Sequence, residues 1–411
     1  MPYSWDDLLQ NGDETAFFRL VGQPISSYSA TIDNRSGSVR STEPRRCHPG
    51  GMNAVGAVLT TGIYCRDACP GRPLPVNTIR YPSAAAAEAA GYRACHRCRP
   101  YRQELSPVAH MPQLVCQGVQ LIADGALDGA KESGLARRLG VSPRHLRRIF
   151  LQHAGVTPDQ LARSRRAHFA RRLLDDTDLR ITDIAFAAGF GSVRQLNRVL
   201  AAVFRSTPRE LRARRRAADR LQADGGLAIR LVHDKALDFP TALNHLAACA
   251  IPSVEAVADD VYRRTILVDD DPGMIEISRR SPTELLLIAH LPRLNGLIHH
   301  VSRARRIFAL DDPAVPYGFW DPFEAEVYDI VRRGTPDAKS AQAALEDLVG
   351  RYGAFVPGLA PIGLTRTFPR PETLAEAELG DLHLPDATIE ALRSLARTIA
   401  DRPPAPCRTP S

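Results

Sequence analysis

The sequence predicts a multidomain chain of mixed class. It predicts a small α+β module built on four cysteines, an all-α domain of tandem helix-turn-helix units, and an α+β sheet domain followed by further helices. The 411 residues suffice for two to four domains at about 100–200 residues each. Two closely spaced cysteine pairs lie in the first quarter of the chain. Helical periodicity follows them, and near residue 227 it gives way to short runs of aliphatic and β-branched residues.

Composition and charge limit the class of protein. No run approaches eighteen apolar residues, and residues 1–10 lack the basic-then-apolar order of a secretory signal. We therefore expect a cytoplasmic protein with no membrane partner. Basic residues outnumber acidic ones by 21 to 8 in residues 131–220 and by 9 to 2 in residues 45–102, whereas residues 221–411 hold 20 basic and 27 acidic residues. Arginine outnumbers lysine by 50 to 3, which suits phosphate contacts but also follows from a GC-rich genome.

The first part of the chain consists of an irregular leader, residues 1–50, and a cysteine module, residues 51–102. The leader is rich in Ser, Thr, Asn, Gly and Pro. The apolar stretch 54–59 predicts a strand, and the alanine-rich stretch 84–91 predicts a helix that ends at a glycine.

Four cysteines of this module have the spacing of a metal site. Cys65 and Cys69 are separated by three residues, and Cys95 and Cys98 by two. Two such short pairs on turns can place four sulfurs tetrahedrally around one zinc ion. On spacing alone a purely structural zinc site is favoured, because closed four-cysteine sites are usually structural.

Residues 113–218 have an almost entirely helical pattern. Breaks at residues 140–142 and 189–192 each separate a short helix from a longer basic one, which predicts two helix-turn-helix units in tandem. We expect Ser142 and Ser192 to cap the second helix of each unit.

Residues 227–312 predict an α+β sheet domain. Strands are expected at 227–232, 262–268, 274–278 and 285–290, with helices at 241–250 and 294–308 between or after them. Residues 313–411 are helical through about 352, then loop-like, with a last helix at 386–400 and a proline-rich tail.

The cysteine module resembles the zinc domain of Ada-type DNA alkylation-repair proteins. The resemblance rests on Thr-Thr-Gly-Ile-Tyr-Cys-Arg at 60–66 and Ala-Ala-Gly-Tyr-Arg-Ala-Cys-His-Arg-Cys-Arg-Pro at 89–100. It implies that Cys65 takes a methyl group from a methylphosphotriester in DNA, which reverses the expectation of a purely structural site. It also implies phosphate contacts from Thr61, Arg72, Arg93 and Arg97. The sequence departs from the family at Asp67, whose carboxylate we expect to slow attack near phosphates.

The helical domain resembles the AraC-type DNA-binding domain. The resemblance rests on Leu-Gly-Val-Ser-Pro at 139–143, Ala-Gly-Phe at 188–190 and Gln-Leu-Asn-Arg at 195–198. It implies that the second helix of each unit enters a major groove of DNA. The residues expected to face the grooves are Arg144, Arg147, Arg194, Gln195, Asn197 and Arg198.

The last part resembles AlkA-type 3-methyladenine glycosylases. The resemblance rests on Arg-Arg-Ile-Phe-Ala-Leu-Asp at 305–311 and Trp-Asp-Pro-Phe-Glu at 320–324. The family's Leu-Gly-Gln-Gln segment is replaced by Val-Arg-Arg-Gly-Thr-Pro at 331–336, and its helix-hairpin-helix and catalytic Asp have no match. We therefore expect an incomplete helical domain at 313–411, whose helices lack packing partners and expose apolar surface, and no glycosylase activity.

Together these features predict a DNA alkylation-damage response protein. Its zinc-bound cysteine would act once as a methyltransferase, and the methylated protein would activate transcription of repair genes. The expected partners are duplex DNA with methylated phosphates, a promoter sequence and RNA polymerase, and the expected location is the bacterial nucleoid. Two alternatives remain open, a 3-methyladenine glycosylase and an AraC-type regulator with a purely structural zinc site.

Overall fold

The computed structural model describes residues 54–103, 111–221, 225–233, 237–311 and 317–400. All of them belong to one compact unit, Cys47–Ser411. The predicted irregular leader and the tail lie outside the described residues. Among the described helices, none has the length and apolar character needed to cross a bilayer.

The metal module, residues 54–103, is a four-stranded sheet with one α-helix. Its elements are β1 Val55–Val58, β2 Ile63–Cys65, η1 Pro75–Asn77, β3 Thr78–Tyr81, α3 Ala84–Ala89, β4 Arg93–Ala94 and η2 Pro100–Arg102. The strand order is β3-β1-β2-β4, with β4 parallel to β2 and the other pairs antiparallel. Ser83 caps helix α3, because its hydroxyl accepts a 3.1 Å hydrogen bond from the Ala86 amide. The predicted strand and helix are confirmed as β1 and α3.

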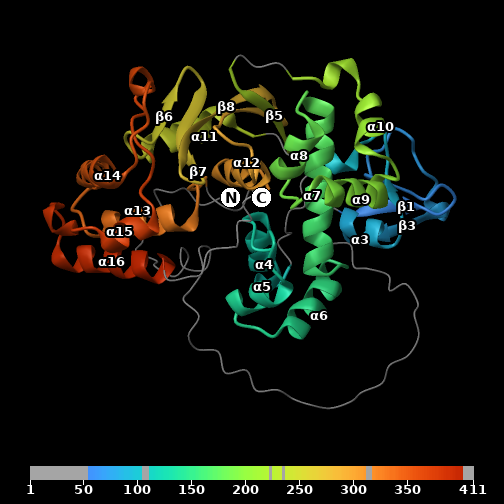
Figure 1. Cartoon of the computed structure of the whole chain (residues 1–411), viewed down its shortest axis with the longest axis horizontal. Helices are drawn as coiled ribbons and strands as arrows, with labels where there is room; N and C mark the ends of the chain where they lie inside the picture. Colours follow the sequence, from blue (N-terminus) through green and yellow to red (C-terminus); the bar gives the residue numbers. More distant parts are fainter. Residues whose placement is uncertain (1–53, 104–110, 222–224, 234–236, 312–316, 401–411) are drawn as a thin grey trace, which may run out of the picture. The chain divides into compact units, whose positions relative to one another are not determined.

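The helical domain, residues 111–221, contains the two predicted helix-turn-helix units (Figure 1). Its elements are α4 Gln113–Ala123, α5 Glu132–Arg138, α6 Pro143–His153, α7 Pro158–Asp176, α8 Ile181–Ala187, α9 Val193–Phe204, α10 Pro208–Ala213 and η3 Ala217–Asp219. Helices α5 and α6 form the first unit, α8 and α9 form the second, and α7 joins them.

The turn and cap residues of the two units explain where their helices begin. Gly140 and Gly189 have φ values of +67° and +76°, a left-handed conformation that glycine adopts without strain. The hydroxyls of Ser142 and Ser192 each accept a 3.2 Å hydrogen bond from an amide in the first turn of α6 or α9. Both predicted caps are therefore confirmed.

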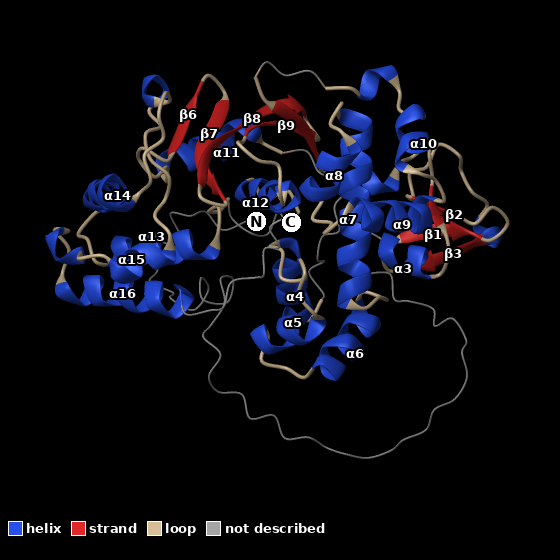
Figure 2. Cartoon of the chain, viewed as in Figure 1, coloured by secondary structure: helices blue, strands red, loops and turns tan. Residues whose placement is uncertain are grey.

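The sheet region, residues 225–311, is a five-stranded antiparallel sheet with two helices (Figure 2). Its elements are β5 Leu227–Val232, α11 Phe239–Ala248, β6 Glu255–Ala258, β7 Val261–Val268, β8 Asp271–Ser281, β9 Glu284–His290 and α12 Leu297–Ile307. The strand order is β5-β9-β8-β7-β6. Four strands match the predicted ones. The short edge strand β6 was not predicted, because Glu-Ala-Val-Ala has few β-branched or aromatic residues.

The terminal helices, residues 317–400, form a separate core together with Ile251 and Val254 of the sheet region. They are α13 Pro322–Arg333, α14 Ala338–Tyr352, η4 Ala360–Ile362, α15 Pro371–Glu376, η5 Leu379–Asp381 and α16 Asp386–Ala400. Ile389, Leu392 and Ala396 of α16 are buried in this core together with apolar residues of α13, α14 and α15. The expectation that helix 386–400 lacks packing partners is therefore wrong.

A second core connects the other three parts. Its buried apolar side chains extend from Val55 in the metal module, through the helical domain, to the sheet region and Trp320. The metal module, the helical domain and the sheet region thus share one apolar interior.

Candidate metal centre and DNA-binding surface

Four cysteine sulfurs come together at one edge of the metal module. Cys65 ends β2, and Cys95 follows β4 directly. Parallel pairing of these strands sets Tyr64 beside Ala94, and the Cys95 amide donates a 3.0 Å hydrogen bond to the Tyr64 carbonyl. Cys69 and Cys98 lie in the turns that follow. All four sulfur atoms lie within 4.8 Å of one another, and the four residues are buried.

This arrangement fits a tetrahedral zinc ion. Zinc–sulfur bonds of about 2.3 Å place the sulfurs of such a site about 3.8 Å apart. The sulfur of Cys69 accepts a hydrogen bond from the Gly71 amide, and that of Cys95 accepts one from the Arg97 amide, both at 3.4 Å. Such bonds stabilise thiolates, the form in which cysteine binds zinc.

Four sulfurs within 4.8 Å of one another repel one another when all are charged. A hydrogen bond between the Cys65 and Cys98 sulfurs lowers the pKa of Cys98 to about 5. The same contact, together with burial, raises the pKa of Cys65. Without a cation one sulfur therefore keeps a proton while its neighbour carries the charge. A divalent cation allows all four to be thiolates at neutral pH.

The carboxylate of Asp67, two residues after Cys65, is already paired. Both of its oxygens accept hydrogen bonds from the Arg80 guanidinium, the Nη2–Oδ2 bond being 3.1 Å long. Both side chains are more than half exposed. Because Arg80 balances the charge of Asp67, the expected obstacle to phosphate approach is weaker than the sequence alone implies.

Three of the four residues predicted to contact phosphates from the metal module are exposed. Thr61 lies in the turn between β1 and β2, Arg72 follows the first cysteine pair, and Arg97 lies between the second pair. Arg93 is half-buried, and its guanidinium donates a 3.3 Å hydrogen bond to the Ala94 carbonyl.

The predicted groove-facing residues lie on α6 and α9. Four of them are exposed: Arg144, Arg194, Asn197 and Arg198. Arg147 is 58% exposed but forms an ion pair with Glu132 of α5. Gln195 accepts a 3.0 Å hydrogen bond from the Gly191 amide, so its side chain also orders the turn before α9.

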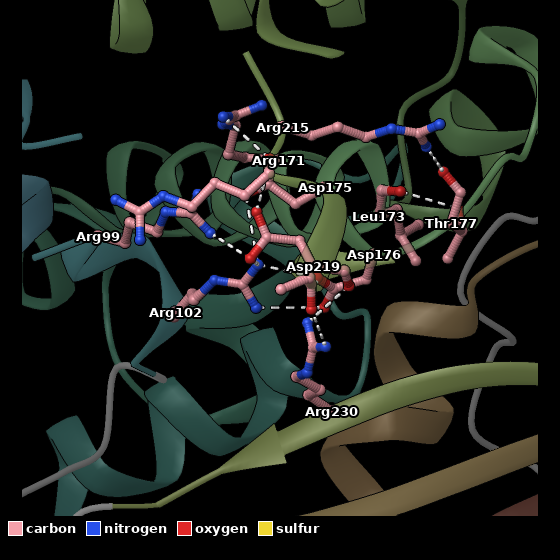
Figure 3. A network of polar contacts seen from close by, with 12 residues as sticks. Arg99, Arg102, Arg171, Leu173, Asp175, Asp176, Thr177, Arg215, Asp219 and Arg230 are labelled. Carbon is pink, nitrogen blue, oxygen red and sulfur yellow. Dashed lines mark hydrogen bonds and ion pairs between the residues drawn. The ribbon is translucent and has the colours of Figure 1, made fainter. Parts of the chain in front are cut away.

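A polar network that the sequence analysis missed attaches the metal module to α7 (Figure 3). Arg102 donates to Asp176 at 2.8 Å, and Arg99 donates to Asp219 at 2.7 Å. Asp175, which is buried, accepts a 2.8 Å hydrogen bond from the Tyr101 hydroxyl. The one available signal was the pair of adjacent acidic residues in an otherwise basic helix.

A second cluster joins β2 to the same helix. The Tyr64 hydroxyl donates a 2.6 Å hydrogen bond to Glu88 of α3, and His168 of α7 lies 2.6 Å from the same carboxylate oxygen. Tyr64 immediately precedes Cys65, so the cysteine edge is linked through one side chain to the helix that joins the two helix-turn-helix units.

Comparison with known proteins identifies the family. The chain is 35% identical over 376 residues to a protein of Mycobacterium tuberculosis (strain H37Rv) named "Probable bifunctional transcriptional activator/DNA repair enzyme AlkA", and the match covers 85% of this chain and 75% of that protein. The chain belongs to this AlkA/Ada family.

Other comparisons match separate parts of the AlkA/Ada-type chain. Residues 52–101 match the metal binding domain of Ada, residues 135–214 a helix-turn-helix domain, and residues 228–315 the AlkA N-terminal domain. The bifunctional transcriptional activator/DNA repair enzyme Ada of Escherichia coli K12 is 32% identical over 39% of this chain and 43% of its own length. AdaA of Bacillus subtilis 168 is 29% identical over 33% of this chain and 63% of its own length. The metal-domain match and the four-sulfur geometry assign one zinc ion to this AlkA/Ada-type chain.

Proposed function

We propose that Cys65 accepts a methyl group from methylphosphotriesters in DNA and that the methylated chain activates transcription of repair genes. The observation that carries this proposal is a buried four-sulfur cluster in the same compact unit as two helix-turn-helix units. The names of the relatives, which combine transcriptional activation with DNA repair, support it.

Hydrogen bonding favours Cys65 over the other three sulfurs as the nucleophile. Backbone amides donate to Cys69, Cys95 and Cys98, and the last of these bonds comes from Arg66. By contrast, contact with the Cys98 sulfur and burial raise the pKa of Cys65, and no backbone amide is among the main influences on its sulfur. A hydrogen bond holds electron density on a thiolate and weakens its attack, so the Cys65 sulfur is the most nucleophilic of the four.

The transfer is a direct displacement at carbon. Bound zinc would keep the cysteine sulfurs deprotonated at neutral pH. The Cys65 sulfur attacks the methyl carbon, a sulfur–carbon bond forms, and the carbon–oxygen bond of the phosphotriester breaks. The electron pair leaves with the phosphate oxygen, which restores an ordinary phosphodiester. The thioether product has no route back, so each chain reacts once.

Methylation also changes the charge of the centre. Four thiolates and Zn²⁺ sum to −2, and conversion of one thiolate to a thioether leaves −1. The metal centre then repels the phosphate backbone less, which favours DNA binding by the two helix-turn-helix units. An activator of this kind would then contact RNA polymerase at the promoter.

Mass spectrometry of the chain after incubation with methylated DNA tests the proposal. We expect one added methyl group, on Cys65, and none on a Cys65→Ser variant that still folds. A methyl group on Cys69, Cys95 or Cys98 would overturn the residue assignment. Absence of any methyl group would favour one of the two alternatives, an AraC-type regulator with a purely structural zinc site.

A further inference from the structure

We propose that the sheet region acts as a brace that holds the two helix-turn-helix units at a fixed mutual orientation. This role requires neither methyl transfer nor base excision, and no comparison assigns it. It follows from the contacts that α12 and β5 make with the helical domain.

Helix α12 holds the loop that precedes the first unit. The two ring nitrogens of His299 lie 2.7 Å from the Ala123 carbonyl and 2.6 Å from the Asp128 carboxylate. About two turns after His299 on α12, Arg306 donates a 2.6 Å hydrogen bond to Asp124. The start and the middle of the loop between α4 and α5 are therefore held by the sheet region.

The same helix reaches the second unit. The Gly296 amide, at the start of α12, donates a 3.1 Å hydrogen bond to the Phe186 carbonyl of α8. Gly189 lies in the turn between α8 and α9, and Asp128 lies beside it. A Cβ atom added to Gly189 would be 3.0 Å from a carboxylate oxygen of Asp128. His299 and Arg166 of α7 both bind Asp128. Through this carboxylate the first unit's loop, α7, α12 and the second unit's turn meet at one place.

The sheet region also contacts α7 at two further points. The Ser302 hydroxyl of α12 accepts a 2.9 Å hydrogen bond from Arg165. At the other end of α7, Arg230 of β5 donates 2.8 Å hydrogen bonds to the Asp176 carboxylate and to the Asp219 carbonyl (Figure 3). The Arg230 and Asp176 side chains are only 8% and 4% exposed. A buried pair of this kind is costly to separate, because each charge would remain without its partner.

Apolar side chains also pack between α12 and the helical domain. Ile298 and Val301 of α12 belong to the same buried core as Ile122 of α4 and Ile184 of α8. The sheet region therefore shares an interior with both units. The exposed residues Arg144, Arg194 and Arg198 lie on α6 and α9, whereas the polar contacts described above involve α4, α7, α8 and their loops.

A fixed orientation matters because the two recognition helices must enter successive major grooves, about 34 Å apart along the duplex. When one helix is bound, a rigid connection keeps the second near its own groove and raises its effective concentration. Loosening the brace should therefore weaken binding to a duplex with two half-sites, and leave binding to a single half-site nearly unchanged.

The test uses the full chain with the double substitution His299→Ala and Arg306→Ala. The matched control is Arg351→Ala, which removes an exposed ion pair with Asp347 on α14. The probe is a duplex selected from a random library by the unaltered chain, compared with the same duplex after one half-site is scrambled. We expect the double variant to lose about tenfold in affinity for the intact duplex. Its affinity for the scrambled one should change little, and the control should bind both normally.

Amide hydrogen exchange gives a second readout that needs no DNA. Peptides covering residues 124–130 and 186–192 should exchange faster in the double variant, while peptides from β7 and β8 keep their protection. If the double variant does not fold, Ser302→Ala removes one hydroxyl and allows the same comparison. If no duplex is enriched, exchange alone decides. Unchanged exchange rates in both peptides, or equal losses of affinity for both duplexes, would overturn the proposal.

Discussion

The Tyr101 hydroxyl donates a 2.8 Å hydrogen bond to the Asp175 carboxylate, which connects the end of the metal module to the last turn of α7. Both side chains are buried. Burial raises the pKa of Asp175, against the opposing effect of Arg171. The Tyr101 hydroxyl is therefore one of the few groups that compensate a costly buried carboxylate.

Removing that hydroxyl should destabilise the chain. Tyr101→Phe should lower the free energy of unfolding by about 1–3 kcal/mol, since it leaves a buried acceptor with one fewer donor. Denaturant unfolding followed by tyrosine fluorescence or circular dichroism measures this. Tyr352→Phe is the control, because it removes a 2.6 Å hydrogen bond to the Glu378 carbonyl at an exposed site. Equal losses of unfolding free energy in the two variants would show that the hydrogen bond to α7 stabilises the chain no more than an exposed one does.

Loss of one cysteine should abolish zinc binding. Cys69→Ala removes one of four sulfurs that lie within 4.8 Å of one another, and three thiolates hold zinc far less tightly than four. Metal analysis of protein purified without chelator should find one zinc per unaltered chain and almost none per variant. Cys116→Ala, outside the cluster, should keep its zinc. A full zinc content in the Cys69 variant would remove this residue from the ligand set.

Methylation of Cys65 should strengthen DNA binding. The loss of one unit of negative charge near phosphates is worth on the order of 1–2 kcal/mol, or roughly tenfold in affinity, and less at high salt. Titration of a selected duplex with methylated and unmethylated chain, at two salt concentrations, measures the effect. Identical affinities at low salt would exclude the charge switch.

A half-buried histidine should make the chain sensitive to acid. The His300 ring stacks on Trp320, with centroids 5.9 Å apart, and burial together with Arg303 lowers the pKa of His300 to about 3. Between about pH 6.5 and pH 3 the unfolded chain binds a proton that the folded chain does not. This histidine therefore costs stability as pH falls through that range, at up to about 1.4 kcal/mol per pH unit, and has no effect above it.

His300→Phe should keep the ring stacking and flatten that part of the stability profile. Unfolding free energies measured between pH 4 and pH 7 provide the comparison. The exposed His383, changed to Gln, serves as the control and should leave the slope as it is. A His300→Phe profile as steep as that of the unaltered chain would show that other groups cause the acid sensitivity.

Purified chain should release no 3-methyladenine from alkylated duplex DNA above a no-protein control. Residues 221–411 hold 27 acidic and 20 basic residues, a balance that opposes the approach of DNA. The buried carboxylate Glu324 accepts hydrogen bonds of 2.8 and 2.9 Å from Arg264 at its two oxygens, so it is not available to stabilise a sugar cation. Release above the control would support the glycosylase alternative.

Local signals predicted much of the fold and of the metal centre. The spacing of the cysteines correctly predicted that Cys65, Cys69, Cys95 and Cys98 form one cluster, because short turns restrict where paired sulfurs can lie. The strand at 227–232 and the helix at 386–400 match β5 and α16 in both bounds, because apolar periodicity is strong there. Contacts between distant residues left no such signal. Arg102 and Asp176 are 74 positions apart, and nothing local marks either as the partner of the other.

Because one interior extends from Val55 to Trp320, we expect the metal module, the helix-turn-helix units and the sheet region to unfold in one cooperative transition. Chelation of zinc should then release not only the metal module but also the helix-turn-helix units and the five-stranded sheet, which would lose the neighbours that cover their apolar faces. The terminal helices, whose core includes Leu345 and Leu392, would melt in a transition of their own. Scanning calorimetry would resolve these as two heat-absorption peaks, of which only the larger moves to lower temperature when zinc is withdrawn.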